Sequence, residues 1–325
     1  LFQCRKKAIS MMVTNEQRLA SQKSSRRLPS SRARWREVKK FLLALAYLSP
    51  SLLIFLAFVF IPLIRSFILS TQLTDPIGRP VAFVGLTQYQ RLLQSPQFLN
   101  SLQRTLLFVL YTVPTTLVIA LGLALLGNLR LRRISIFRMI FSLTIAVSAA
   151  TASLIFLYLF HPALGMLNYL LGLLGIPSVG WLTDVRTALP SVALVTVWLQ
   201  LGLNTVILLA GMQGIPEELY ESAMIDGASG PARFRHITLP LLSPTIFFLL
   251  VVDLLAAFQA FTQFHVLTKG GPINSTNVLV FSIYREFYFN GQYSYAAAQS
   301  IVLFFIMLVV TIIQFGVIER RVVYE

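Results

Sequence analysis

Few residues in this sequence are spaced for catalysis or for metal binding. The single cysteine, Cys4, excludes an internal disulfide and a cysteine metal cluster. The three histidines, His161, His236 and His265, lie far apart and have no metal-ligand spacing. The sequence contains no nucleophile–base set and no G-x-x-x-x-G-K-[ST] phosphate loop. We therefore expect no enzyme active site, and no cofactor, metal or ATP bound by this chain.

Polar side chains that interrupt long apolar stretches are stronger candidates for function. Three of them are spaced at i, i+4 and i+8 in one stretch, which predicts a polar stripe on one helix face. The next stretch holds a carboxylate and two amides. Polar groups inside a membrane are costly and face a cavity or each other. We interpret the six as a candidate solute path, with hydrogen bonding between packed helices as the alternative: Thr196, Gln200, Asn204, Asp253, Gln259 and Gln263.

The composition places these residues in a membrane. The chain is 56% hydrophobic and 12% charged, with a mean hydropathy of +0.74, whereas about 25% of residues in a soluble domain are charged. About 20 apolar residues span a bilayer. Because a lipid-exposed backbone must satisfy its own hydrogen bonds, each such stretch should be helical. The sequence predicts an all-α polytopic membrane protein with six transmembrane helices, at residues 41–63, 105–126, 137–160, 189–212, 241–266 and 295–318.

The net charge of +15 comes largely from one end of the chain. Of the 27 lysines and arginines, 12 precede residue 41, where the only acidic residues are Glu16 and Glu37. This excess indicates a basic tail and not a nucleic-acid-binding face. The domains are thus a tail at residues 1–40 and a transmembrane domain at residues 41–325. Because the first apolar run is long and has no small-residue cleavage site, we expect an uncleaved span and not a signal peptide.

The distribution of lysine and arginine predicts the orientation. The tail, the loop 128–138, the segment 221–244 and the C-terminal residues together hold 20 basic residues, and the loops of the opposite side hold 7. By the positive-inside rule, both termini and the loop 213–244 are cytoplasmic. On the outer side, residues 83–105 predict an amphipathic surface helix that begins after Gly85, and residues 161–184 predict a re-entrant or surface helix.

The segment "ESAMIDGASGPARFRHITLPLLSP", residues 221–244, breaks the apolar pattern between the fourth and fifth spans. Pro216 suits the first position of a short helix, and Gly227 suits a left-handed residue that ends it. Ser229 and Pro231 suit the start of a second short helix, which we expect Pro240 to stop. The sequence therefore predicts two short helices around a sharp turn, with a solvated connecting loop as the alternative.

The segment resembles the EAA loop of permease subunits of binding-protein-dependent ABC importers, in the carbohydrate-uptake branch. That pattern reads E-A-A-x-x-D-G-A, then five residues, then F-x-x-I-x-L-P-x-x-x-P, and Ser222 in place of the first Ala is the one departure. "FVGLTQYQRLL", "FHPALGMLN" and "VLTKGGPINST" resemble further family signatures, and the C-terminal part is most similar to the glycerol-3-phosphate permeases. The matched residues are Glu221, Ala223, Asp226, Gly227, Ala228, Phe234, Ile237, Leu239, Pro240 and Pro244.

The resemblance implies a transport subunit and not an enzyme. ATP and Mg would bind a separate cytoplasmic ATPase, which would hydrolyse the ATP. The implied partners are a second permease subunit in a heterodimer, two ATPase subunits, an extracytoplasmic solute-binding protein and membrane lipid, in a bacterial plasma (inner) membrane. The residues expected to dock on the ATPase are Glu221, Ala223, Asp226, Gly227, Ala228, Phe234, Ile237 and Pro240.

Asp253 bears on the partner and on the solute. We expect it to pair with a polar group of the second permease subunit in preference to Arg65 or Arg104. A carboxylate in the path would repel an anion, and the middle of each span lacks lysine and arginine, which favours a neutral sugar or polyol glycoside. Glycerol 3-phosphate is the alternative solute. An ion-coupled secondary transporter is a remote alternative, because it would need an ion site of its own.

Overall fold

The computed structural model describes residues 31–129 and 131–319, and these are mostly helical. The chain divides after Ile64 into two compact units, each described here by itself. The tail predicted for residues 1–40 falls almost wholly outside the described residues. The extreme C-terminus at residues 320–325 also lies outside them.

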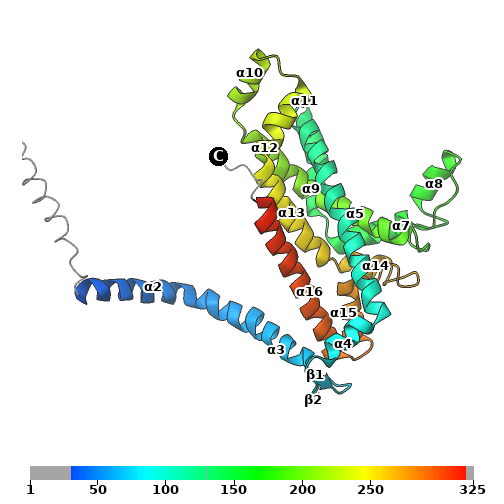
Figure 1. Ribbon diagram of the computed structural model, residues 1–325. Helices are drawn as coiled ribbons and strands as arrows, with labels where there is room; N and C mark the ends of the chain where they lie inside the picture. The colour runs from blue at the N-terminus through cyan, green and yellow to red at the C-terminus, as the bar shows by residue number, and fades with distance from the viewer. Residues whose placement is uncertain (1–30, 130, 320–325) are drawn as a thin grey trace, which may run out of the picture. The chain divides into compact units, whose positions relative to one another are not determined.

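The first unit is helical throughout its described part. Helix α2 (Ser31–Phe55) is followed by one π-helical turn, η1 (Leu56–Phe60), and then by α3 (Ile61–Ser70) (Figure 1). The stretch Leu42–Ser70 is long and apolar enough to cross a membrane, and it extends past the predicted end at residue 63. Of its described side chains, none in the most apolar window is buried. A helix that is apolar on all sides without a core of its own is typical of a membrane span.

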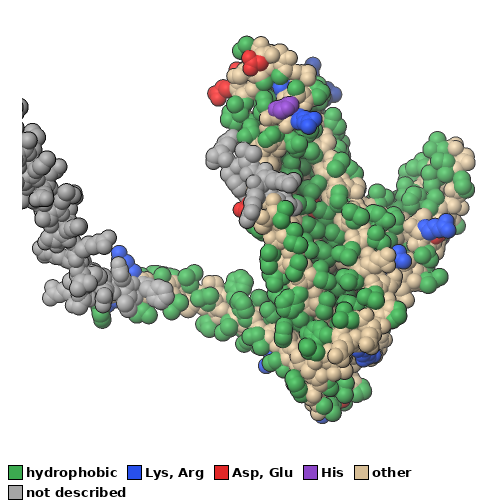
Figure 2. All heavy atoms as spheres, viewed as in Figure 1, with side chains coloured by type: hydrophobic (Ala, Val, Ile, Leu, Met, Phe, Trp, Pro, Cys, Tyr) green, Lys and Arg blue, Asp and Glu red, His purple; other side chains and the backbone are tan. Residues whose placement is uncertain are grey.

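The second unit is a bundle built around α5 (Pro96–Gly127) and α9 (Ala188–Gln213), which pack along each other (Figure 1). Helices α13 (Ser243–Phe258), α14 (Thr262–Leu267) and α16 (Tyr293–Ile313) complete it, and α16 continues into a π-helical turn, η4 (Gln314–Ile318). Phe108, Val192 and Leu208 are fully buried between these helices. Apolar side chains also cover most of the visible outer face, as a lipid-exposed surface requires (Figure 2).

The second span is longer than predicted. Helix α5 begins at Pro96, nine residues before the predicted start at residue 105. Ser95 caps it, since its side chain accepts a hydrogen bond from the backbone N–H of Phe98, and a proline at the first position suits a helix start. The single amphipathic helix expected after Gly85, up to residue 105, is therefore two elements, α4 (Thr87–Gln94) and the first turns of α5.

The third span differs from the straight helix predicted at residues 137–160. Helix α6 (Ile134–Ser142) and a 3-10 turn, η2 (Leu143–Ala146), are followed by α7 (Ala149–Leu159), and the two halves meet at an angle of 104°. Ser148 caps the second half by accepting a hydrogen bond from the N–H of Thr151 at 3.2 Å. Among the residues that the structure describes, five helices are long and apolar enough to cross a membrane, or six if the bent pair is one span.

At one end of the second unit lie the only described strands, a two-stranded antiparallel hairpin of β1 (Gln72–Thr74) and β2 (Pro80–Phe83), with Leu73 opposite Ala82. We call this the hairpin end. Ser294 at the start of α16 donates a hydrogen bond to Thr74 at 3.1 Å, which fixes the hairpin to the bundle. Helices α15 (Leu279–Tyr288) and α8 (Met166–Leu173) complete the connections. The short α8 agrees with a surface helix between the third and fourth spans.

Candidate functional site

The loop between α9 and α13 is built from short helices, as its sequence predicts, at the end of the unit opposite the hairpin; we call this the loop end (Figure 1). Helix α10 (Glu217–Ile225) is followed by Asp226 as its C-cap and then by Gly227, whose φ of +75° lies in the left-handed region. The N–H of Ala228 bonds the carbonyl of Ala223 at 2.8 Å, and the N–H of Gly227 bonds that of Met224 at 3.1 Å. This pair of bonds is a Schellman motif, which explains the glycine at this place.

The second short helix starts after Ser229 and runs through α11 (Gly230–Arg233), the π-helical turn η3 (Phe234–Thr238) and α12 (Leu239–Leu241). The expectation that Pro240 stops this helix is wrong, because Pro240 lies inside α12 and the break falls at Leu242. Pro240 closely follows the π-helical turn η3, where the regular α-helical hydrogen-bond pattern is already interrupted. The segment therefore runs almost directly into α13.

One side-chain contact fixes the two short helices to each other. The hydroxyl oxygens of Tyr220 on α10 and Thr238 on η3 lie 3.0 Å apart and share a hydrogen bond. Thr238 is 6% exposed, so the bond is sheltered from water. Together with the Schellman motif, this bond gives the segment a defined shape.

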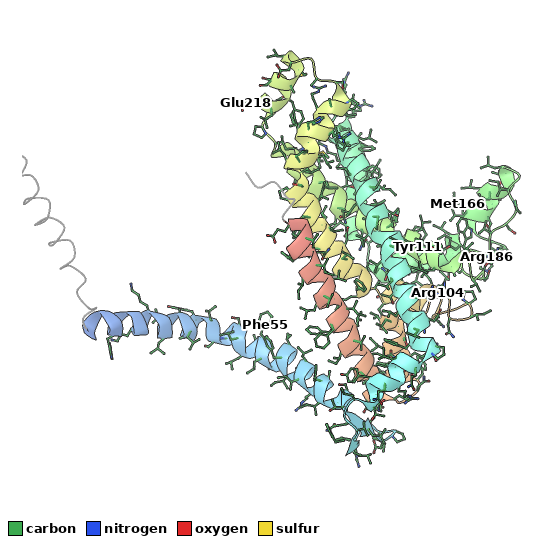
Figure 3. The ribbon with its side chains drawn as sticks, viewed as in Figure 1. Phe55, Arg104, Tyr111, Met166, Arg186 and Glu218 are labelled. Atoms are coloured by element: carbon green, nitrogen blue, oxygen red, sulfur yellow. The ribbon has the colours of Figure 1, made fainter. Side chains whose placement is uncertain are left out.

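The outer surface of the segment carries exposed apolar side chains with acidic side chains around them. Ile225 is 87% exposed and Leu219 is 42% exposed. Acidic side chains gather at this end of the molecule in Figure 2, and Figure 3 labels Glu218 on α10 there. Of the predicted docking residues, Glu221, Asp226 and Gly227 are exposed, whereas the remaining five are half-buried: Ala223, Ala228, Phe234, Ile237 and Pro240.

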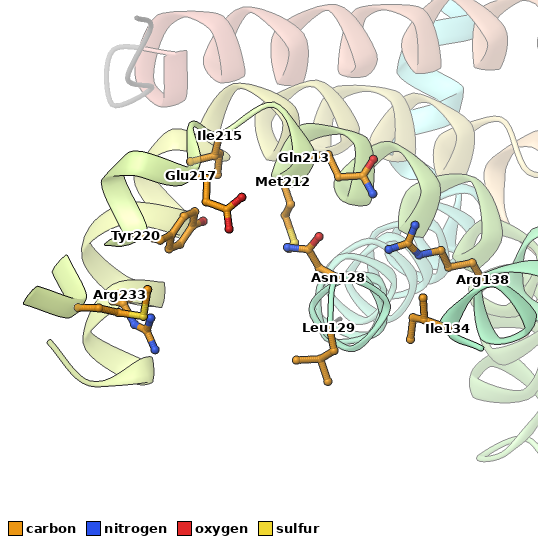
Figure 4. A pocket seen from close by; sticks show the side chains of 11 residues that line it. Asn128, Leu129, Ile134, Arg138, Met212, Gln213, Ile215, Glu217, Tyr220 and Arg233 are labelled. Carbon is orange, nitrogen blue, oxygen red and sulfur yellow. The ribbon is translucent and has the colours of Figure 1, made fainter. Parts of the chain in front are cut away.

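A cavity of about 670 Å³ separates the segment from the ends of α5, α6 and α9. Tyr220 and Met224 of α10 line one side, and Met212 of α9 lines another. The guanidinium groups of Arg138 and Arg233 enter from opposite sides (Figure 4). Arg138 is held by a 2.9 Å hydrogen bond from its Nε to the carbonyl oxygen of Gly127. The cavity leaves the segment supported mainly through α9 and α13.

Inside the bundle, two of the predicted polar residues pair with each other. Nδ2 of Asn204 on α9 donates a hydrogen bond to Oδ1 of Asp253 on α13 at 3.1 Å. These residues are 2% and 3% exposed. The expectation that Asp253 meets a polar group of a second subunit is thus wrong for Oδ1, which has its partner in this chain. Oδ2 of Asp253 and Oδ1 of Asn204 are buried without partners among the described residues.

The other two residues of the polar stripe also form hydrogen bonds. Oε1 of Gln200 accepts a hydrogen bond from Thr116 on α5 at 3.3 Å. Thr196 donates to the carbonyl oxygen of Val192 in its own helix at 3.1 Å. The Thr116–Gln200 and Asn204–Asp253 bonds join two helices, as the helix-packing alternative expects, whereas the Thr196 bond stays within α9.

The two remaining candidates flank a break in the fifth span. Gln259 is the exposed residue at the end of α13, and Gln263 is buried in α14. The described contact of the Gln259 amide is a long 3.9 Å one, from Nε2 to Sδ of Met307. Broken helices in transporters expose backbone and side-chain polar groups at solute sites. Gln259 is therefore the candidate with the most freedom to meet a solute.

Sequence reasoning missed polar residues on the second and sixth spans. Thr116 bonds Gln200, and the side chains of Thr112, Gln299 and Gln314 are buried within the bundle. Gln314 donates from Nε2 to the carbonyl oxygen of Leu250 at 3.5 Å, one turn from Asp253. The signal that could have found them is the rule already applied to the fourth and fifth spans, because these residues also interrupt apolar runs.

The comparisons with known proteins agree with this architecture. The model of the family "binding-protein-dependent transport system inner membrane component" matches residues 82–324. The chain belongs to this family. The permease is 37% identical over 277 residues to the sn-glycerol-3-phosphate transport system permease protein UgpA of Pectobacterium atrosepticum, covering 85% of this chain and 94% of that protein. The UgpA of Agrobacterium fabrum is 36% identical over 279 residues, with the same coverage.

Solved structures agree with the fold of the permease. A chain of the bacterial alginate ABC transporter, in complex with an alginate pentasaccharide-bound periplasmic protein, superimposes with a TM-score of 0.75 at 25% identity. The match covers 86% of this chain and 95% of that one. A second structure of a bacterial ABC transporter that imports alginate matches with a TM-score of 0.74.

Family membership decides between the classes that the sequence left open. The chain is the membrane-embedded permease subunit of an ABC importer, a multi-pass protein of the inner membrane, and not an enzyme. The secondary-transporter and nucleic-acid interpretations are thereby excluded. In this family the permease chain is the inner membrane component of a transport system, and this sequence contains no phosphate-loop motif.

Proposed function

We propose that residues 213–244 form the docking element through which a cytoplasmic ATPase drives this permease. The observation that carries the proposal is the segment itself: two short helices with a fixed turn present the exposed Ile225 and Leu219 at the loop end of the bundle. An amphipathic helix that lays apolar anchors into a groove is a recurrent mode of protein recognition. In this assignment Gly227 sets the turn, and Glu221 and Asp226 make polar contacts around the anchors.

The same geometry supports a way of transmitting movement into the membrane. Helix α12 leads into α13 with only Leu242 between them. Tyr220 joins α10 to η3, the element that precedes α12, through its hydrogen bond to Thr238. A push on the segment would therefore move α13, which is bonded to α9 through Asp253 and Asn204. The cavity behind α10 leaves room for such movement. ATP and Mg would act on the ATPase and not on this chain.

The proposed assembly follows from the apolar surfaces that this chain by itself leaves exposed. A second permease subunit, in a heterodimer, would cover the apolar surface that this chain leaves exposed, and two ATPases would bind the two docking segments. An extracytoplasmic solute-binding protein would deliver solute at the hairpin end. With the loop end in the cytoplasm, both termini are cytoplasmic, as the basic tail and the loop arginines favour.

For the solute we propose a sugar-type molecule, with sn-glycerol 3-phosphate as the first candidate. The two UgpA relatives are named for this compound, and the alignment with this chain covers 94% of the length of each at 36–37% identity. The electrostatic argument for a neutral sugar loses its basis, because Asp253 is 3% exposed and bonded to Asn204 instead of facing an open path. A neutral sugar or polyol glycoside is now the alternative.

Arginines at the hairpin end support an anionic solute. Nε of Arg104 donates to Oδ1 of Asn100 at 3.3 Å, and Nη1 of Arg285 donates to Oδ1 of Asn274 at 2.9 Å. Asn100 also donates to the backbone carbonyl oxygen of Asn274 at 3.1 Å, so the four residues form one connected group (Figure 3 labels Arg104). Two guanidinium groups close to the proposed entrance would raise the local concentration of an anion.

Two experiments test these proposals separately. Co-purification of an ATPase with the permease, and its loss on changing the segment, tests the docking role. Uptake and binding-protein titrations that compare sn-glycerol 3-phosphate with neutral disaccharides test the solute. Selective uptake of a neutral disaccharide would overturn the solute proposal and leave the docking proposal intact.

A further inference from the structure

The connection between α5 and α6 forms an apolar groove with two arginines on it. The groove has a volume of about 290 Å³, and Arg132 and Arg133 are the only charged residues among its described lining, which contains no acidic side chain. Its walls are apolar side chains: Leu126, Leu129, Leu131, Ile134 and Phe137. A ligand that matches such a surface has an anionic part and an apolar part.

The backbone of the groove is held in an unusual conformation. Arg133 has a φ of +72°, in the left-handed region that residues other than glycine, asparagine and aspartate seldom adopt. The N–H of Ile134 bonds the carbonyl oxygen of Leu131 at 3.2 Å, and the N–H of Ile136 bonds that of Arg133 at 3.0 Å. Strained residues of this kind persist where the surroundings fix them and cluster at ligand sites. Here the turn places two successive arginines on one groove.

The surface that continues from the groove along α6 is apolar. Ile136 is 52% exposed, Met139 58% and Ile140 54%. The one charged side chain of α6, Arg138, is occupied by the carbonyl oxygen of Gly127. In a permease whose α6 begins the third span, exposed apolar surface of this kind lies against acyl chains. An anionic head group on the arginines and acyl chains along α6 would therefore both be accommodated.

We propose that this groove binds one anionic phospholipid, whose phosphate is held by Arg132 and Arg133 and whose acyl chains lie along α6. Basic pockets at the ends of membrane helices select anionic head groups in this way. The inference depends on α5 and α6 lying in the membrane and not on which solute is carried. The groove shares Leu129 and Ile134 with the cavity behind the docking segment, so a bound lipid would stiffen one wall of that cavity.

The test measures lipid retained by the purified full chain, with whichever subunits co-purify. After delipidation, the protein is titrated with phosphatidylglycerol or phosphatidylcholine and followed by native mass spectrometry. We expect one phosphatidylglycerol to bind at least about tenfold more tightly than phosphatidylcholine. The double variant Arg132→Gln/Arg133→Gln should lose that preference.

A matched control removes two exposed arginines elsewhere, in the variant Arg79→Gln/Arg186→Gln, which should keep the wild-type preference. Equal binding of both lipids by the wild type, or unchanged binding by the Arg132→Gln/Arg133→Gln variant, would overturn the proposal and leave the arginines as orientation signals only. Displacement of the lipid by equimolar inorganic phosphate would also overturn it, because the site would then be one for a soluble anion. Leu131→Asn, which keeps both arginines, should weaken phosphatidylglycerol binding if the acyl chains use the apolar wall.

Discussion

Asn204 and Asp253 join the two helices that lead into and out of the docking segment. Nδ2 of Asn204 lies 3.1 Å from Oδ1 of Asp253, across 49 residues of sequence that contain the whole segment. Both side chains are almost completely buried, in a bundle whose interior is otherwise largely apolar. The pair therefore closes a loop made of α9, the segment and α13. The pair is one of the contacts that would couple a movement of the docking segment to both helices.

The pair makes a prediction about stability. Asn204→Leu removes the described partner of the Asp253 carboxylate, and leaving a buried polar group without its partner costs about 1–3 kcal/mol. We expect a clearly lower melting temperature in detergent, measured by fluorescence-detected size-exclusion chromatography after heating. Asp253→Asn keeps the acceptor Oδ1 and adds a donor that can reach the free Oδ1 of Asn204, so this variant should melt at or above the wild-type temperature. Equal destabilisation by both changes would contradict the pairing.

A second prediction concerns the turn of the docking segment. Gly227 has a φ of +75°, and a β-branched residue in that region costs about 1–2 kcal/mol locally. Gly227→Val should abolish ATP-dependent uptake while the amount of permease in the membrane stays the same, because the turn lies outside the bundle. Gly227→Asn should keep partial uptake, since asparagine tolerates this conformation.

The matched control for this prediction is Gly230→Ala. Gly230 lies in the same segment without a positive φ, and nothing within 4 Å would meet an added methyl group. Wild-type uptake is expected from this variant. If Gly227→Val transports as well as Gly230→Ala does, the shape of the turn does not matter for coupling.

The exposed glutamine at the break of the fifth span gives a third prediction. Gln259→Leu should raise the KM for uptake about 3- to 10-fold, the effect of losing one net hydrogen bond to solute. The amount of folded permease should not change, because the described contact of the amide is the long one to Met307. Gln90→Leu makes the same change at an exposed site on α4 and should leave KM unchanged. An unaltered KM in Gln259→Leu would remove this residue from the solute path.

How much the sequence could predict depends on how local each feature is. The turn at Gly227 was predictable because its two hydrogen bonds involve only residues 223–228. The helical spans were predictable because bilayer thickness sets their length. The early start of α5 depends on the Ser95 cap, which is visible in the sequence but lies before the apolar run.

The bend of the third span depends on contacts that sequence spacing does not reveal. Gly202 on α9 lies so close to the third span that an added methyl group would collide with Thr144 and the carbonyl oxygen of Phe141. This close approach of Gly202 positions the C-terminal end of the α6–η2 half of the span. Ser148 then caps α7, which runs in another direction. The partner of Asp253 was missed for the same reason, because Asn204 is 49 residues away and meets it only after the helices pack.

The last prediction concerns the apolar anchor of the docking segment. Ile225 is 87% exposed on α10, which is unusual for an isoleucine unless another surface covers it. Covering such a side chain contributes about 1.5–3 kcal/mol, so Ile225→Ser should weaken ATPase binding about tenfold or more. The variant permease alone should melt at the wild-type temperature, since the side chain packs on little within the chain. Co-purification of the ATPase and titration of the isolated ATPase onto the permease in detergent measure the effect.

The chain offers a matched control for this change in Ile273, which is also 87% exposed but lies in a loop at the hairpin end. Ile273→Ser removes the same exposed apolar surface and should leave ATPase binding unchanged. Ile225→Leu should restore most of the affinity, because a groove that accepts one branched aliphatic side chain tolerates another of equal volume. If Ile225→Ser and Ile273→Ser weaken ATPase binding equally, the loss of binding results from removing any exposed apolar side chain and not from a docking contact at Ile225. If neither weakens it, the ATPase contacts the segment through its acidic residues alone.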